Sequence, residues 1–222
     1  MDENFNDNKD EDYAEERGGK YDDHITAEAD ELQKESIDKK RIKKIDRSKK
    51  IAAIESVFDE RTIFHLNKLI VNGPLEEIVG IVSAGKEANI YLGYDREGRE
   101  LAIKVYKIDS NTSRWMRSYI IGDPRFKKIP HNTAKVIYLW ASKEFKNLKR
   151  AFKSGLAVPE PYHVQNNILL MQFIGFGAIP APKLKDIKTL SNPLETFDSI
   201  LHFIKDLYQD ANLVHGDLSE FN

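Results

Sequence analysis

Three short runs of strand-forming residues, separated by tight turns, constrain the fold of this chain most strongly. The runs cover residues 78–82, 88–94 and 100–106, and the turns between them cover residues 83–87 and 95–98. Short runs rich in β-branched and aromatic residues, joined by Gly-containing turns, predict β-hairpins. Because a hairpin pairs its two strands antiparallel, the sequence predicts an antiparallel sheet in the middle of the chain.

Helices are predicted on both sides of these strands. Residues 59–72 start at Asp59, a good cap, and stop before Gly73 and Pro74, and a second short helix or turn is expected at residues 75–78. A long helix is expected over residues 133–155, with a buried stripe of Ile137, Ala141, Leu148 and Phe152. Two further strands are expected at residues 162–164 and 168–174. This mixture predicts an α+β fold.

The carboxy-terminal part is predicted to begin with another helix. Asn192, Pro193 and Glu195 supply a cap, a proline at the first helical position and an acidic third position. The expected apolar face of this helix consists of Leu194, Phe197, Leu201, Ile204 and Tyr208. The helix leads into a polar loop that begins at His215.

The amino-terminal 50 residues differ in composition from the rest. Residues 1–35 are strongly acidic and poor in apolar side chains, which predicts disorder, and residues 39–50 are rich in lysine and arginine. The basic stretch is read either as an arm that contacts RNA or as a solvated helical face. The 222-residue chain has a net charge of −2, no cysteine and no signal-peptide pattern, so we expect a cytoplasmic protein without membrane contact.

Lys104 is the first candidate for a functional side chain. It interrupts an apolar strand, where a charge is costly unless it is paired. Glu144 lies on the buried side of the long predicted helix, four residues before Leu148, and is the candidate partner. The alternatives are an edge-strand lysine that points to solvent and an exposed glutamate beside the stripe.

Three connections could contact a ligand through their backbone. The turn at residues 83–87 has a hydroxyl at Ser83 and an ammonium at Lys86, and such turns can present N–H groups to phosphates. Residues 109–130 are expected to form an adaptable, flexible loop. The strand at residues 168–174 ends at a glycine pair, where a hinge would offer the Gln172 carbonyl and the Ile174 N–H to an adenine edge.

The last eight residues contain an Asp followed five positions later by an Asn, at Asp217 and Asn222. Phosphotransferases use this spacing: the Asp accepts a proton from the attacking hydroxyl and the Asn binds a metal ion. The alternative is an ordinary polar turn after a helix.

In register, these motifs resemble those of the RIO kinases, a family of atypical serine/threonine protein kinases. Residues 83–89 resemble the family's S-T-G-K-E-A-N loop, with Ala84 at the threonine position, and residues 119–126 resemble its flexible loop. Residues 143–148 and 215–222 match as well, and residues 57–62 look like the Rio-one subfamily. The resemblance implies a two-lobed, protein-kinase-like fold, with an antiparallel-sheet N-lobe, a long helix and the start of a helical C-lobe. The implied segments are a tail at 1–50, a helical extension at 51–80, the N-lobe at 81–174, and the hinge and C-lobe at 175–222.

The resemblance also implies roles for individual residues. Asp217 would be the general base, Asn222 a ligand of Mg²⁺ or Mn²⁺, and Lys104, paired with Glu144, would orient the phosphates of ATP. Met171 would lie at the gate of the adenine pocket beside the hinge residues Gln172 and Ile174, and the phosphate loop would include Ser83, Lys86 and Glu87. Gly216 and Ser219 replace the Arg and Lys of ordinary kinases, which implies that activation-loop phosphorylation is not the switch.

The implied partners are ATP, a protein substrate with Ser or Thr, and a precursor of the small ribosomal subunit, with contact to rRNA through residues 39–50. ATP hydrolysis is a further implied activity. Two alternatives remain: a nucleotide-gated assembly factor with little kinase activity, and a small-molecule phosphotransferase. The family carries a second metal-binding Asp after the catalytic loop, so we expect the chain as given to be an amino-terminal portion that exposes part of a core and is inactive by itself.

Overall fold

The computed structural model describes residues 58–123 and 129–221, and residues 58–222 form one compact unit. The expectations for residues 1–57, including the acidic tail and the basic stretch, and for Asn222 lie outside the described residues. The observed architecture is α+β, as predicted. No helix in the described part of the chain is long and apolar enough to cross a membrane.

The sheet has five antiparallel strands in the order β1-β2-β3-β5-β4. Their bounds are β1 Leu75–Ala84, β2 Ala88–Asp95, β3 Glu100–Tyr106, β4 Pro161–Gln165 and β5 Ile168–Gln172. The short helix or turn expected at residues 75–78 is wrong, and the segment boundary expected at residue 80 falls inside β1. Leu75 is fully buried and pairs with Asp95, so cross-strand pairing overrides the local helical preference of its neighbours.

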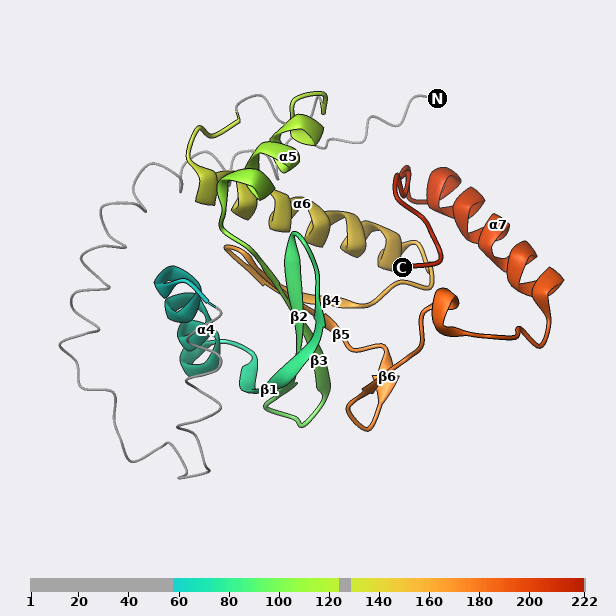
Figure 1. Ribbon diagram of the computed structural model, residues 1–222, viewed down its shortest axis with the longest axis horizontal. Coiled ribbons are helices and arrows are strands. Elements are labelled where there is room, and N and C mark those ends of the chain that lie inside the picture. The colour runs from blue at the N-terminus through green and yellow to red at the C-terminus, as the bar shows by residue number, and fades with distance from the viewer. Residues whose placement is uncertain (1–57, 124–128, 222) are drawn as a thin grey trace, which may run out of the picture. The chain divides into compact units, whose positions relative to one another are not determined.

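The two faces of the sheet pack against different helices (Figure 1). Helix α4, Glu60–Asn72, covers one face with Leu66 and Leu69, and it is capped by Asp59, whose carboxylate accepts from the Thr62 N–H at 3.0 Å. Helix α6, Thr133–Lys153, packs against the other face with Val136, Ile137 and Ala141. Both helices lie where the sequence predicts them. Phe152, however, is 40% exposed and does not continue the buried stripe.

Residues 109–130 are not a loop throughout. Ser110–Ile120 form helix α5, capped by Asp109, and α5 packs on α6. Thr112, Met116 and Ile120 recur at a four-residue spacing on its buried face. The loop prediction is therefore wrong over this helix. Two of its buried side chains, Thr112 and Ser113, are polar, and the aromatic Trp115 and Tyr119 are exposed, so little apolar periodicity is visible in the sequence.

The segment after the sheet contains a two-stranded ladder, β6 Gly175–Phe176 with β7 Ile179–Pro180, a short 3₁₀ turn at Leu184–Asp186, and helix α7, Pro193–Gln209. The predicted start of α7 is confirmed, although the Asn192 side chain donates to Glu195 Oε2 at 2.6 Å instead of capping a backbone N–H.

The face of α7 that is covered is not the predicted apolar face. Leu207, with Phe203 and Ala211 one turn to either side, packs against Ala151 of α6. The five residues of the expected apolar face are all exposed: Leu194, Phe197, Leu201, Ile204 and Tyr208. An apolar stripe shows that a helix has an apolar face, but which residues are covered depends on the partner that it meets.

Candidate nucleotide and phosphoryl-transfer site

The centre of the candidate site is an ion pair between β3 and α6. The ammonium Nζ of Lys104 lies 2.7 Å from Glu144 Oε1 and 2.9 Å from Oε2. The two side chains are 24% and 28% exposed, so the pair lies at the edge of the core, open to solvent on one side. A lysine ammonium has three N–H donors, and with two directed at Glu144 one remains for a ligand oxygen.

The packing of the sheet and α6 brings these two residues together. Side chains alternate along a strand, so Lys104 shares its face with Ala102 and Tyr106, and that face looks towards α6. Ile137 and Ala141 anchor α6 to the same face, which places Glu144 one turn further along the helix. The predicted contact between Lys104 and Glu144 is confirmed. The roles assigned to these two residues remain predictions.

Tyr106 is a third member of this cluster that the sequence reasoning missed. Its hydroxyl donates to Glu144 Oε2, and Lys104 Nζ lies 5.0 Å from the centre of its ring. Burial and the neighbouring Glu144 carboxylate raise the pKa of the Tyr106 hydroxyl well above its usual value. The signal was available, because Tyr106 follows Lys104 by two residues in the same strand.

An apolar cluster adjoins Lys104 along the sheet. Ala102 precedes Lys104 by two residues on the same face and pairs with Met171 of β5. The cluster consists of Leu92, Ala102, Phe173, Val82, Ile90 and Met171. The structure thus places apolar side chains, which suit a planar aromatic base, next to a cation, which suits phosphate. Sequence reasoning identified Met171 but not Val82, Ile90 or Ala102.

The predicted phosphate loop is a tight turn between β1 and β2. Ser83 is still in β1, opposite Ile90, whereas Lys86 and Glu87 are exposed at the tip. A Cβ at Gly85 would lie 2.8 Å from the Ala88 carbonyl oxygen, so the turn requires glycine there. Lys107 holds the turn, because its Nζ donates to the Gly85 carbonyl at 2.7 Å.

A hollow of about 290 Å³ lies between this turn and the start of α5. Lys86 and Glu87 line it on one side, and Asp109, Asn111, Thr112 and Trp115 complete its lining. The segment that was expected to be a flexible loop therefore adjoins the predicted phosphate loop as an ordered helix.

The predicted hinge follows β5. Gln172 is the last residue of β5, and its N–H donates to the Glu160 carbonyl at 2.8 Å. Ile174 is half exposed, and its carbonyl accepts from the Ala181 N–H at 2.9 Å. These bonds fix the backbone of the segment without using the Ile174 N–H that was proposed for adenine.

The predicted catalytic loop is exposed. Asp217 lies at its centre, and its backbone N–H contacts His215 Nδ1 at 3.4 Å. Gly216 has a φ of +77°, a conformation that side chains with a Cβ rarely adopt, which gives a physical reason for glycine before Asp217. The Glu220 carbonyl accepts from the Lys185 N–H at 3.0 Å, which ties the loop to the preceding 3₁₀ turn.

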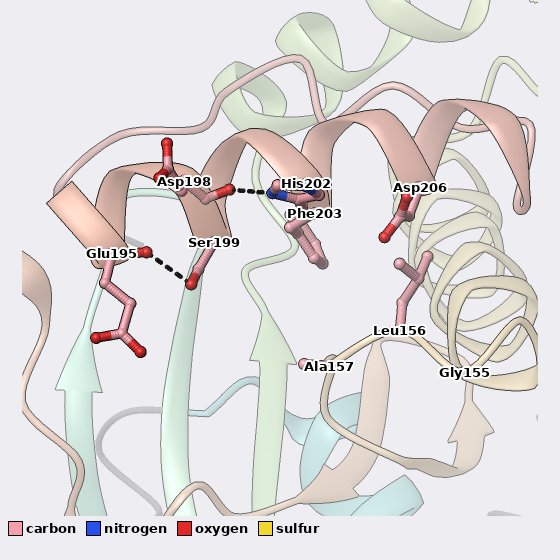
Figure 2. A pocket seen from close by; sticks show the side chains of 9 residues that line it. All are labelled: Gly155, Leu156, Ala157, Glu195, Asp198, Ser199, His202, Phe203 and Asp206. Atoms are coloured by element: carbon pink, nitrogen blue, oxygen red, sulfur yellow. Dashed lines mark hydrogen bonds between the residues drawn. The ribbon is translucent and has the colours of Figure 1, made fainter.

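A larger hollow of about 650 Å³ lies elsewhere, between α7 and the turn after α6 (Figure 2). Its lining is Gly155, Leu156, Ala157, Glu195, Asp198, Ser199, His202, Phe203 and Asp206. None of the site residues predicted from sequence is among them. The larger of the two hollows therefore does not coincide with the predicted site residues.

Metal binding was predicted for Asn222, which is not described. In residues 58–123 and 129–221, no group of three or more His, Cys, Asp or Glu side chains is arranged to hold a metal ion.

Comparison with known proteins identifies the family. The model of the RIO domain matches residues 89–222, which is more than half of the chain. The chain belongs to the RIO domain family. This confirms the resemblance to the RIO kinases.

The chain is similar to curated relatives from archaea and eukaryotes. It is 38% identical over 76% of its length to the RIO-type serine/threonine-protein kinase Rio1 of Haloferax volcanii, and 40% identical over 86% to that of Methanocaldococcus jannaschii. It is also 38% identical over 77% to the human serine/threonine-protein kinase RIO1. The chain spans 57% and 64% of the two archaeal relatives and 31% of the human one.

Among solved structures, the chain is similar to the Rio2 kinase–ADP/Mg²⁺–phosphoaspartate complex from Chaetomium thermophilum. The sequence identity is 16% and the TM-score 0.48, over 64% of this chain and 40% of the other.

Proposed function

We propose that this chain carries the nucleotide-binding and phosphoryl-transfer residues of an ATP-dependent RIO-type serine/threonine-protein kinase. The observation that carries the proposal is the ion pair of Lys104 and Glu144, 2.7 Å apart, beside the apolar cluster of Ala102 and Met171. Membership of the RIO domain family and the kinase names of the relatives support it.

The adenine would lie on the apolar cluster, with the backbones of Gln172 and Ile174 at its edge. The phosphates would then lie near the remaining donor of Lys104 and near the turn of Ser83, Lys86 and Glu87. This arrangement acts by positioning and charge neutralisation, which account for most of the catalysis of phosphoryl transfer.

In the transfer step, the hydroxyl oxygen of a substrate Ser or Thr bonds to the γ-phosphorus, and the bond to the β–γ bridging oxygen breaks. Asp217 accepts the hydroxyl proton, and ADP leaves. Asn222 would contribute to holding Mg²⁺, which neutralises charge on the phosphates. The resemblance to RIO kinases extends the proposal to slow ATP hydrolysis, with water as the acceptor, and to action on a precursor of the small ribosomal subunit.

The test is transfer of label from γ-labelled ATP with Mg²⁺ to casein, a general Ser/Thr acceptor, by the full-length protein. We expect acid-stable phosphoserine or phosphothreonine, and a decrease in transfer of roughly 10²- to 10³-fold in Lys104→Met. Lys146→Met is the matched control, because Lys146 is an exposed lysine on α6, and it should transfer normally.

Failure of the wild-type protein to bind ATP would overturn the proposal. ATP binding with transfer only to small alcohols would replace it with a small-molecule phosphotransferase. ATP binding without transfer to any acceptor, protein or small, would favour the nucleotide-gated assembly factor.

A further inference from the structure

One side chain, Tyr106, contacts both members of the ion pair. Its hydroxyl donates to Glu144 Oε2, which also accepts from Lys104 at 2.9 Å, and the Lys104 ammonium lies 5.0 Å from the centre of its ring. Glu144 Oε1 accepts from Lys104 alone among its described contacts. Both carboxylate oxygens of Glu144 thus accept hydrogen bonds, and Oε2 accepts two.

Tyr106 is held far more firmly than the pair that it contacts. It is 2% exposed, and its ring belongs to the cluster of Met116, Ile120, Val136, Ile137, Ala141 and Leu169. Its backbone is fixed on both sides by Asn167, because the Tyr106 N–H donates to the Asn167 carbonyl and the Asn167 side chain donates to the Tyr106 carbonyl, each at 2.9 Å.

The hydrogen bonds that fix the Tyr106 backbone extend to helix α4. Asn167 is fully buried and also donates to Thr62 Oγ1 at 2.8 Å. The Thr62 hydroxyl in turn donates to the carboxylate of Asp59, the cap of α4, at 2.7 Å. Hydrogen bonds therefore connect the start of α4 to the Tyr106 backbone, and the Tyr106 side chain connects that backbone to the carboxylate of Glu144.

We propose that Tyr106 is a positioning residue that fixes the Glu144 carboxylate on Lys104, so that the ion pair is assembled before nucleotide binds. This role rests on the proposed function of the pair in holding the phosphates of ATP. Glu144 is 28% exposed, and an exposed pair alone contributes little against the rotamer freedom of two long side chains. A buried donor that cannot move removes much of that freedom from the carboxylate.

Chemistry supports the assignment of donor and acceptor. Because burial and Glu144 raise the pKa of the Tyr106 hydroxyl well above its usual value, the hydroxyl keeps its proton and remains a donor at neutral pH. The device is built from the chain's own residues and needs no phosphate. This fits the expectation that phosphorylation of an activation loop is not the switch, because Gly216 stands where ordinary kinases carry the arginine that binds a phosphorylated loop.

The test measures the state of Lys104 directly, without turnover. The full-length protein, free of nucleotide, is trace-labelled with acetic anhydride, and acetylation of each lysine is read by peptide mass spectrometry. In Tyr106→Phe we expect Lys104 to be acetylated roughly 5- to 10-fold faster, which corresponds to the loss of one hydrogen bond of typical net strength. Lys146 serves as the internal reference. In the ATP assay the same variant should raise KM for ATP by a similar factor.

The matched control is Tyr91→Phe. Tyr91 is also a buried tyrosine of the sheet, but it lies on the face covered by α4, and its hydroxyl contacts Asn89. It should leave Lys104 acetylation unchanged even where it lowers Tm, which separates positioning from general loosening of the fold. In the Glu144→Ala background, Tyr106→Phe should add nothing to the acetylation of Lys104.

Two results would overturn the inference: unchanged Lys104 acetylation in Tyr106→Phe, or an equal increase in Tyr91→Phe. If Tyr106→Phe does not fold, the Glu144→Ala variant decides, because unchanged Lys104 acetylation in that protein would show that the pair does not shield the ammonium. Absence of ATP binding by the wild type would refute the proposed function and not the positioning role, because acetylation of Lys104 needs no ATP.

Discussion

The two halves of the candidate site are built very differently. Around Lys104, the sheet and α6 form a core in which Tyr106 is 2% exposed and both oxygens of Glu144 are bonded. Around Asp217, the residues from His215 to Phe221 are all exposed. One of their contacts is the 3.0 Å bond from the Lys185 N–H to the Glu220 carbonyl. The half around Lys104 is fixed by the packing that stabilises the fold, and the exposed half around Asp217 is not.

From this difference we expect substitutions in the core and in the loop to affect stability and activity differently. A change in the sheet–α6 core should affect both properties, whereas a change in the exposed loop should affect activity alone. The following predictions test that separation.

The largest effect is expected for Asp217→Asn. If Asp217 is the general base, its loss should lower phosphoryl transfer roughly 10²- to 10⁴-fold. Because Asp217 is exposed and the amide has the same shape, Tm should not change. The measurement is γ-labelled ATP transfer by the full-length protein together with its thermal unfolding. A large fall in Tm would contradict the difference between the two halves, since it would show that the loop unfolds cooperatively with the core.

The next effect is on stability. Ile103 of β3 is fully buried in the cluster that includes Leu66 and Leu69 of α4, and Ile103→Ala should lower the free energy of unfolding by about 2–5 kcal/mol. The matched variant is Phe197→Ala on α7, where the side chain is 57% exposed, and the expected change there is about 0.5 kcal/mol or less. Urea unfolding measures both. A similar loss in the two variants would mean that the α7 stripe is covered in solution.

A smaller, pH-dependent effect is expected from His65 on α4. Burial, with a further contribution from Lys68, lowers its pKa from 6.5 to about 4, and Asn166 donates a hydrogen bond to its neutral ring. Because the pKa is lower in the folded state, the stabilisation is present above pH 6.5 and is lost as pH falls towards 4. About 2 kcal/mol should be lost at pH 5.

The measurement is urea unfolding at pH 7 and pH 5 for the wild type and for His65→Gln. The variant should lack most of the difference between the two pH values. His202→Gln on exposed α7 is the control and should retain it. An equal pH dependence in wild type and His65→Gln would show that other groups cause the loss.

The local features of the fold could be predicted because they depend on near neighbours in the sequence. The hairpins of β1, β2 and β3 follow from turn chemistry, and the start of α4 follows from the Asp59 cap. The helix α5 could not be recognised, because two of its buried residues, Thr112 and Ser113, are polar, and their burial is decided by tertiary packing. The exposed stripe of α7 shows the opposite error, since apolar spacing indicated a buried face that the described chain does not cover.

For the site, the sequence by itself determined the candidates: a lysine in an apolar strand, a glutamate on the inner side of a long helix, and an Asp–Asn loop. The 2.7 Å approach of Lys104 to Glu144 is a contact across 40 residues, and only the packing of α6 on the sheet decides it. The same is true of Tyr106. Its position two residues after Lys104 is local information, but its hydroxyl meets Glu144 because strand alternation and helix packing direct both side chains to one place.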